Sequence, residues 1–242
     1  MGYFYINSPV YYILALVVMI WSFAVQSALK SKAKKGSQIR AQSGKTANSV
    51  VQEMLAAHDI YGITIEHKPG ELTDCYSPKE GKIYLSDTTY NQTSITAIAV
   101  AAHECGHAVQ DHVNMPIYRF RQLLAPAAGI CSSAGVYIVI GGLLLSRFAS
   151  GNSDLAFFIC NLGIVVYLGT FLFYLVMLPV ERDASRRAYK DMKEFGWVGE
   201  DQLKQTYKVL RAAGDTYAVA LASSALTLLR LLLIRGNSRR RS

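Results

Sequence analysis

The chain has 242 residues, of which 51% are hydrophobic and 17% are charged, and its net charge at pH 7 is +8. This length allows one large domain, or one domain with appendages. The Lys and Arg residues cluster beside long apolar runs, which is typical of membrane-flanking segments and argues against nucleic acid as a partner. The cysteines Cys75, Cys105, Cys131 and Cys160 have no paired short spacing. We therefore expect small buried hydrophobes, and neither a disulfide framework nor a Cys-based zinc site.

The first apolar run, Pro9 to Leu29, has no charged residue and is long enough to cross a hydrocarbon core of about 30 Å. The charged leader of a cleaved signal peptide does not precede it, so residues 1–29 are expected to be a transmembrane anchor. Basic residues follow with no acid before Glu53, namely Lys30, Lys32, Lys34, Lys35, Arg40 and Lys45. The positive-inside rule then predicts that the N-terminus is outside and the basic side is in the cytoplasm.

Residues 30–122 predict a small cytoplasmic α+β domain. Its expected elements are a polar linker over 36–48, a helix from Asn48 to about Gly62, a strand over 63–67, a second strand region over 72–86, and a helix that starts after Thr93 or Ser94 and ends near Asp111. An edge strand could align an extended peptide by main-chain hydrogen bonds. A sheet that only covers the core is an equally good interpretation.

The last of these helices carries a His-Glu-x-x-His motif over 103–107. Residues i and i+4 lie on one face of a helix, so His103 and His107 can both bind one Zn²⁺ ion. Glu104 is rotated by about 100° from His103 and can approach a metal-bound water without being a ligand. A catalytic zinc site needs a third ligand and an open position as well.

Two further apolar runs, Leu123–Leu145 and Leu155–Val180, predict a transmembrane hairpin over 123–180 with a polar loop over 146–154. The first run is rich in Gly, Ala and Ser, which allow close contact between helices in a bilayer. Basic residues precede the hairpin and follow it. Both of its ends are therefore expected on the cytoplasmic side, together with the zinc helix.

The C-terminal region, 181–242, begins with a polar helical segment that extends to about residue 215. A fourth apolar stretch over 217–234 contains Arg230, and further arginines follow it. If this stretch crossed the membrane, these arginines would emerge outside. We therefore favour a helix that packs on the catalytic domain or lies at the interface over a fourth span.

Glu181 is the best candidate for the third zinc ligand, because it follows the third apolar run directly on a helix that is expected to continue. The alternative is a carboxylate that is solvated, or paired with Arg182 or Arg186. Asp183 lies about 200° around the helix from Glu181, so both cannot face one metal. The remaining histidines, His58, His67 and His112, have no ligand spacing and are expected to be ordinary surface residues.

Several stretches of the chain together resemble the YugP-like neutral zinc metallopeptidases of bacteria. They are Lys-Pro-Gly-Glu-Leu-Thr-Asp at 68–74, Val-Ala-Ala-His-Glu-Cys-Gly-His-Ala-Val-Gln at 100–110, Leu-Pro-Val-Glu-Arg-Asp-Ala-Ser-Arg-Arg-Ala at 178–188 and Leu-Leu-Arg-Leu-Leu-Leu-Ile at 228–234. The order of zinc helix, two spans and ligand helix is also similar to the HtpX-type heat-shock membrane proteases. The resemblance implies that His103, His107 and Glu181 are ligands and that Glu104 is the general base.

The chain departs from these families at two positions. Where the HtpX-type pattern has an Asp four residues after the ligand Glu, this chain has Ser185, which could supply the hydrogen bond to a zinc-bound His instead. Asp183 is a second candidate for such a supporting role. In the YugP-like family we expect His at the position of Cys75.

Taken together, the sequence predicts a mainly α integral membrane protein. It combines a zincin-like α+β catalytic domain, which contains a small β-sheet, with three or four membrane-associated helices. The predicted function is that of a multi-pass zinc endopeptidase of the bacterial inner membrane, with a cytoplasmic active site and membrane proteins as polypeptide substrates. The oxyanion donor stays open between residues such as Tyr217 and Arg186. The alternative is a non-catalytic membrane scaffold or adaptor that zinc stabilises; a transporter is a weaker third interpretation.

Overall fold

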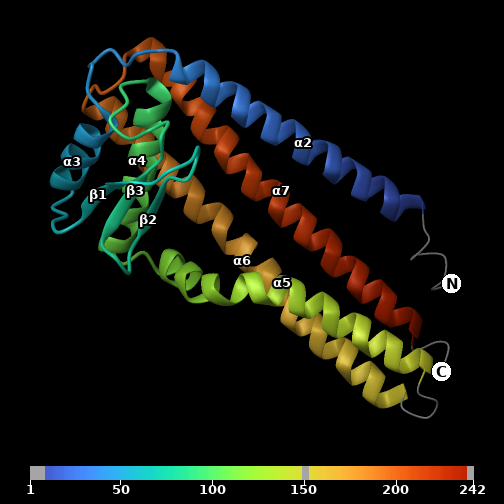
Figure 1. The fold of residues 1–242 in the computed structure, drawn as a ribbon. Coiled ribbons are helices and arrows are strands. Elements are labelled where there is room, and N and C mark those ends of the chain that lie inside the picture. Colours follow the sequence, from blue (N-terminus) through green and yellow to red (C-terminus); the bar gives the residue numbers. More distant parts are fainter. Residues whose placement is uncertain (1–8, 149–152, 239–242) are drawn as a thin grey trace. The chain divides into compact units, whose positions relative to one another are not determined.

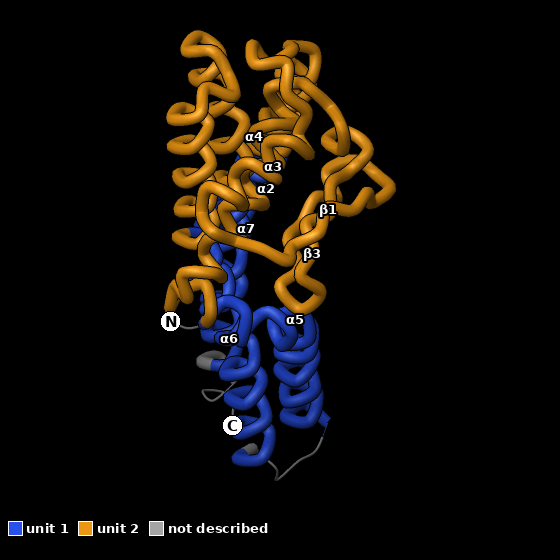
Figure 2. The backbone as a smooth tube through the Cα atoms, turned by 90° about the vertical axis from the view of Figure 1, so that its left-hand side faces the viewer, with its two compact units in different colours: residues 1–23, 120–178, 217–242 blue, residues 24–119, 179–216 orange. Residues whose placement is uncertain are grey.

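The computed structural model describes residues 9–148 and 153–238 and is mainly helical, with one small sheet (Figure 1). The helices are α2 (Pro9–Ser37), α3 (Ala47–Ala57), α4 (Ile95–His112), α5 (Pro116–Phe148), α6 (Ser153–Glu194) and α7 (Glu200–Ser238), and the strands are β1 (Thr64–His67), β2 (Cys75–Ser77) and β3 (Lys82–Leu85). Figure 2 colours two compact units, which are residues 1–23, 120–178 and 217–242 (unit 1) and residues 24–119 and 179–216 (unit 2). The predicted mainly α class with a small sheet is confirmed, whereas its zincin-like character stays a prediction.

Helix α3 forms the first layer of the core of unit 2. The Thr46 side chain caps it by accepting a hydrogen bond from the Ser49 N–H at 3.2 Å. The helix ends at Ala57, earlier than predicted, because Asp59 has a positive φ of 55° and Gly62 one of 84°. A left-handed backbone cannot continue an α-helix, so the chain turns here into β1.

The sheet has the order β1-β3-β2, with β1 parallel and β2 antiparallel to the central strand β3. Ile83 and Leu85 of β3 are fully buried and pack in the same hydrophobic core as α3 and α4. Strand β2 therefore has one edge paired with β3 and one edge available to other groups. The unpaired edge of β2 lies next to Glu104 of the candidate site.

Helix α4 is the most buried helix of unit 2. Of the two predicted caps, Ser94 is the one that forms, since its side chain accepts a hydrogen bond from the Ala97 N–H at 3.2 Å. Its apolar residues, including Cys105, lie in the core. Cys105 thus behaves as the small buried hydrophobe that we expected.

Helix α6 continues through Pro179 without a break, and its residues 179–194 belong to unit 2. These residues lie very close to α4, because a Cβ added to Gly106 would be only 2.7 Å from the carbonyl oxygen of Ala184. Ala184 is completely buried. A glycine at position 106 is therefore what lets the two backbones touch, one turn away from Glu181.

Unit 1 consists of apolar helical segments. Val139 of α5, Leu231 of α7 and residues of α6 form a common hydrophobic cluster. Gly142 and Gly163 permit close backbone contact between α5 and α6, as the small residues of the predicted hairpin suggested. Four of the described helices, namely α2, α5, α6 and α7, are long and apolar enough to cross a membrane, and many large hydrophobic side chains on α2, α5 and α6 are exposed.

The C-terminal apolar stretch groups with the other apolar helices. Residues 217–242 belong to unit 1 and not to the unit that contains α4, and α7 is long and apolar enough to cross a membrane; its place at the interface, on the catalytic domain or across the membrane stays a prediction. Leu231 contacts the other apolar helices. In the predicted hairpin loop over 146–154, residues 149–152 lie outside the described part of the chain, as do the terminal arginines 239–241.

Candidate metal centre

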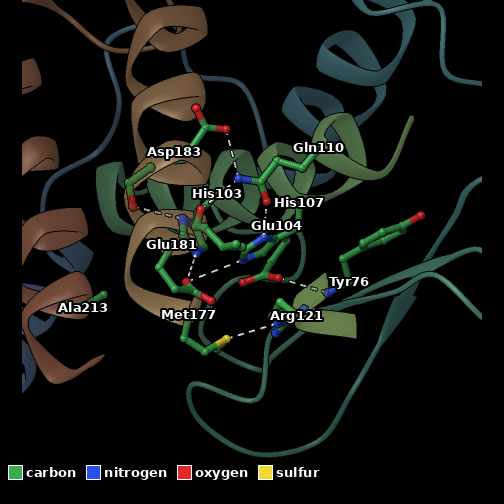
Figure 3. Close-up of polar contacts among 12 residues, drawn as sticks. Tyr76, His103, Glu104, His107, Gln110, Arg121, Met177, Glu181, Asp183 and Ala213 are labelled. Atoms are coloured by element: carbon green, nitrogen blue, oxygen red, sulfur yellow. Dashed lines mark hydrogen bonds and ion pairs between the residues drawn. The ribbon is translucent and has the colours of Figure 1, made fainter. Parts of the chain in front are cut away.

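Two histidines of α4 and one glutamate of α6 converge inside unit 2. Figure 3 shows His103, His107 and Glu181 pointing toward one another. Glu181 Oε2 lies 3.1 Å from His103 Nε2 and 3.5 Å from His107 Nε2. The three donor atoms all lie within 4.8 Å of one another. In the part of the chain that the structure describes, this is the one group of His, Cys, Asp and Glu that could hold a metal.

The spacing of these donors fits a zinc ion. Bonds of about 2.0–2.1 Å to N and O donors in a tetrahedron separate the ligand atoms by about 3.3 Å. The two nitrogen–oxygen distances of 3.1 and 3.5 Å bracket this value. Two imidazoles and one carboxylate are also the donor set of a catalytic zinc site that keeps a fourth position for water.

The Gln110 side chain determines which nitrogen of His107 is free to bind a metal. Gln110 Nε2 donates to the carbonyl oxygen of Val180 at 2.8 Å and to Asp183 Oδ2 at 3.0 Å. Both partners only accept, so the amide cannot be flipped, and its oxygen faces His107 Nδ1 at 3.0 Å. Nδ1 must then carry a proton, so Nε2, which lies 3.5 Å from Glu181 Oε2, is the nitrogen that can bind a metal.

His103 is oriented in a similar way by a hydroxyl group. Ser185 Oγ lies 3.2 Å from His103 Nδ1. Ser185 is one helical turn beyond Glu181, so one face of α6 contacts both the Nδ1 and the Nε2 side of the His103 ring. Tyr118, which is fully buried, stacks on the His107 ring at a centroid distance of 6.1 Å.

Glu104 is buried beside the two histidines and is held by the free edge of the sheet. Its Oε2 accepts a hydrogen bond from the main-chain N–H of Tyr76 in β2 at 3.0 Å (Figure 3). The Tyr76 hydroxyl donates to Asp111 Oδ2 at 2.9 Å. Tyr76 is therefore bound to α4 through both its main-chain N–H and its side-chain hydroxyl, and it fixes the direction of the Glu104 carboxylate.

The electrostatics of the cluster favour an ionised carboxylate. Burial raises the pKa of Glu181, but the hydrogen bonds and charges of His103 and His107 lower it more, and the net shift is downward. Only 2% of Glu181 is exposed, so it does not match the alternative of a solvated carboxylate. For Tyr76, burial and the Asp111 carboxylate raise the pKa of the phenol, which keeps its hydroxyl protonated as a donor.

The other predicted residues lie elsewhere in unit 2. His58 contacts Asp191 at 2.7 Å and His67 contacts Asp87 at 2.6 Å, while His112 is exposed at the end of α4. The Cys75 thiol lies 3.7 Å from Lys68 Nζ, and burial raises its pKa.

Asp183 accepts hydrogen bonds from Gln110 and, at 2.7 Å, from Arg187. It does not face the histidines, as its angle around α6 predicted. Of the two oxyanion candidates, Arg186 belongs to unit 2 and Tyr217 to unit 1.

Sequence reasoning did not single out Gln110 or Tyr76. Gln110 carried a usable signal, because it lies three residues after His107 and therefore on the same helical face. Tyr76 carried none, since it contributes a main-chain N–H that any residue except proline supplies.

Comparisons with known proteins agree with this geometry. The sequence pattern of the family described as "Putative neutral zinc metallopeptidase" matches residues 11–236. The "Putative membrane protease YugP" of Bacillus subtilis (strain 168) is 33% identical over 226 residues, which cover 93% of this chain and 96% of that protein. No solved structure matches the chain significantly.

Proposed function

Because the chain belongs to the neutral zinc metallopeptidase family, we propose that it is a membrane-embedded zinc-dependent endopeptidase. In this proposal His103, His107 and Glu181 hold the metal and Glu104 is the general base. The observation that carries the proposal is the convergence of the three donors within 4.8 Å. Glu104 lies buried on the same helix.

His103, His107 and Glu181 would hold the zinc ion, which would supply a water molecule of lowered pKa and a Lewis acid for the peptide carbonyl. Glu104 accepts the proton of the attacking water and delivers it to the leaving amine. The Tyr76 N–H binds Oε2 of Glu104. The second carboxylate oxygen forms no hydrogen bond with any described residue, which leaves it free for proton transfer.

The groups behind the ligands have a positioning role in this proposal. Gln110 and Ser185 each bind the Nδ1 of one histidine, so the Nε2 atoms are directed at the metal. Asp183 and Arg187 extend this network by holding the Gln110 amide. Such outer contacts raise the affinity of a zinc site by fixing ring orientation and tautomer.

The substrate is proposed to be a polypeptide, in particular a membrane protein or its cytoplasmic segment. The outer edge of β2 lies beside Glu104, which accepts the Tyr76 N–H there, and an extended peptide is proposed to pair with the remaining main-chain groups of this edge. The chain is a membrane protein, given its four long apolar helices and its similarity to a membrane protease. We further propose the bacterial inner membrane, with the active site on the cytoplasmic side.

The base assignment is tested with Glu104→Gln in the purified full-length protein. We expect zinc content to stay at the wild-type level and peptide cleavage to fall by about 10²–10⁴-fold. Glu71→Gln, a change in an exposed loop, is the matched control and should cleave normally. Retained cleavage by Glu104→Gln would refute the role of Glu104, and a zinc-loaded wild type without any cleavage would favour the scaffold function instead.

A further inference from the structure

A second feature of unit 2 is a pocket of about 330 Å³ between α6 and α7, next to the candidate metal centre. Its lining includes Arg182, Ser185 and Arg186 of α6 and Tyr207, Arg211 and Asp215 of α7. The volume is at the lower end of the range of about 300–1,000 Å³ that is usual for ligand sites. All these residues belong to unit 2.

The pocket is cationic, because its lining has three arginines against one aspartate. Within the described residues, Arg182, Arg186 and Arg211 form no salt bridge with any carboxylate. This differs from Arg187, which points to Asp183 and is paired there at 2.7 Å. The charge of Arg186 still acts on Asp183. Planar guanidinium groups outside a salt bridge are suited to bind a carboxylate or a phosphate by paired hydrogen bonds.

One residue joins the pocket to the candidate metal centre. Ser185 lines the pocket, and its Oγ is also 3.2 Å from His103 Nδ1. Arg182 and Arg186 lie three residues before and one residue after Ser185, so they follow the same side of α6. An anionic group held by these arginines is therefore separated from a metal ligand by a single side chain.

We propose that this pocket binds an acidic side chain of the polypeptide substrate, close in sequence to the bond that is cut. The inference rests on the proposed peptidase function and adds a preference for Asp or Glu at one substrate position. A lipid phosphate shares the same chemistry. The peptide is favoured because the pocket shares Ser185 with the candidate metal centre.

The test measures peptide binding and does not depend on cleavage. Full-length Glu104→Gln protein in neutral detergent is titrated with fluorescent octapeptides that carry either Glu or Gln at each position in turn, and anisotropy is recorded. We expect Glu to bind about tenfold more tightly than Gln at one position, as one charge-assisted contact implies. Arg186→Gln and Arg211→Gln, each added to this background, should reduce that ratio to about two or less.

Two matched controls remove the same charge from the same helices outside the pocket. Lys190→Gln on α6 and Lys208→Gln on α7 are exposed and do not line it, so both should keep the tenfold ratio. The reversal Arg211→Glu should shift the preference at that position from Glu to Lys. Equal binding of Glu and Gln peptides at all positions, a preference that survives both arginine variants, or no binding at all would overturn the proposal.

A second experiment, with lipid present, distinguishes an acidic peptide side chain from a lipid phosphate as the group that occupies the pocket. The same titration is repeated in nanodiscs of phosphatidylcholine, with and without phosphatidylglycerol. The Glu preference should persist in both, whereas its loss with the anionic lipid would show that a headgroup occupies the pocket and would overturn the proposal. If wild-type protein cleaves no peptide while the Glu preference is present, the peptidase function fails and the pocket assignment stands.

Discussion

The buried amide of Gln110 determines which nitrogen of the His107 ring carries a proton. It is completely buried, and all its hydrogen-bonding partners are defined. Because its NH₂ group faces two acceptors, its oxygen must face His107. The tautomer of His107 thus follows from the main chain of α6, where the Val180 carbonyl is located.

Replacing Gln110 should therefore weaken metal binding although none of the three proposed ligands is changed. We expect Gln110→Leu to lower zinc affinity by about 10–100-fold, because His107 loses the acceptor that keeps its proton on Nδ1. Competition with a zinc chelator measures this affinity in purified protein. Gln92→Leu, an exposed control, should bind zinc like the wild type; an equal loss in both variants would contradict this role of Gln110.

At the residue scale, the sequence points to the candidate ligands but not to the side chains and main-chain groups that hold them in place. His103, His107 and Glu104 follow from a five-residue pattern whose spacing is set by helix geometry. Glu181 follows from its position at the end of an apolar run, and the structure brings it to the histidines. Gln110 donates to the main chain of α6, and the Tyr76 main-chain N–H donates to Glu104 of α4. Both contacts depend on how segments distant in sequence pack together, which a pattern of side-chain types does not reveal.

Among the elements, the contact between α4 and the 179–194 part of α6 positions Glu181, the proposed third ligand. Gly106 lies against the Ala184 backbone, where there is no room for a Cβ. Sequence patterns predicted both helices, but they could not predict this contact, since a glycine inside a helix has several uses. The close approach brings Glu181 within reach of two side chains of α4.

A methyl group at position 106 should push the two helices apart. We expect Gly106→Ala to lower the free energy of unfolding by about 1–3 kcal/mol, as overpacking does. We also expect it to reduce the zinc content of the purified protein. Gly141→Ala is the control, because a Cβ at Gly141 of α5 meets no atom within 4 Å. Wild-type stability and zinc content in Gly106→Ala would contradict the proposed packing role.

A second inter-element contact should make the stability of unit 2 depend on pH. Glu53 of α3 accepts hydrogen bonds from Lys45 Nζ at 2.5 Å and from Trp197 Nε1 at 2.9 Å. Burial raises the pKa of Glu53, but these donors and the charge of Lys45 lower it more, to below its ordinary value of 4.5. A lowered folded-state pKa stabilises the protein above the unfolded value, and this stabilisation is lost as the pH falls.

Glu53→Gln should therefore be less stable than the wild type at pH 7. The difference should shrink as the pH falls below about 4.5, where the wild-type carboxylate becomes protonated in the unfolded chain. Denaturant titrations of both proteins at pH 7, 5, 4 and 3 measure the difference. A difference that stays constant over this range would rule out Glu53 ionisation as its cause.

For the whole molecule, the main question is the side of the membrane on which unit 2 lies. The Lys-rich segment after Leu29 and the arginines after Val180 both belong to unit 2. The positive-inside rule places such segments in the cytoplasm. For residues 217–234 the rule favours a helix that does not cross the membrane, and this stays a prediction, while the stretch groups with the apolar helices of unit 1.

Reporter fusions test this orientation in cells. A reporter fused after residue 150 should be extracytoplasmic, and one fused near residue 200 should be cytoplasmic. Alkaline phosphatase, which is active only outside the cytoplasm, and a fluorescent protein that is active inside it give complementary readouts. The opposite pattern would reverse the orientation and place the proposed catalytic residues outside the cell membrane.

The separation of the zinc donors along the chain has a consequence for biosynthesis. His103 and Glu181 are 78 residues apart, and the whole of α5 is translated between them. A nascent chain that has completed α4 has only two of the three donors, so it cannot assemble the metal centre. If His103, His107 and Glu181 hold the metal as proposed, the metal centre can form only after the ribosome has translated the apolar part of α6.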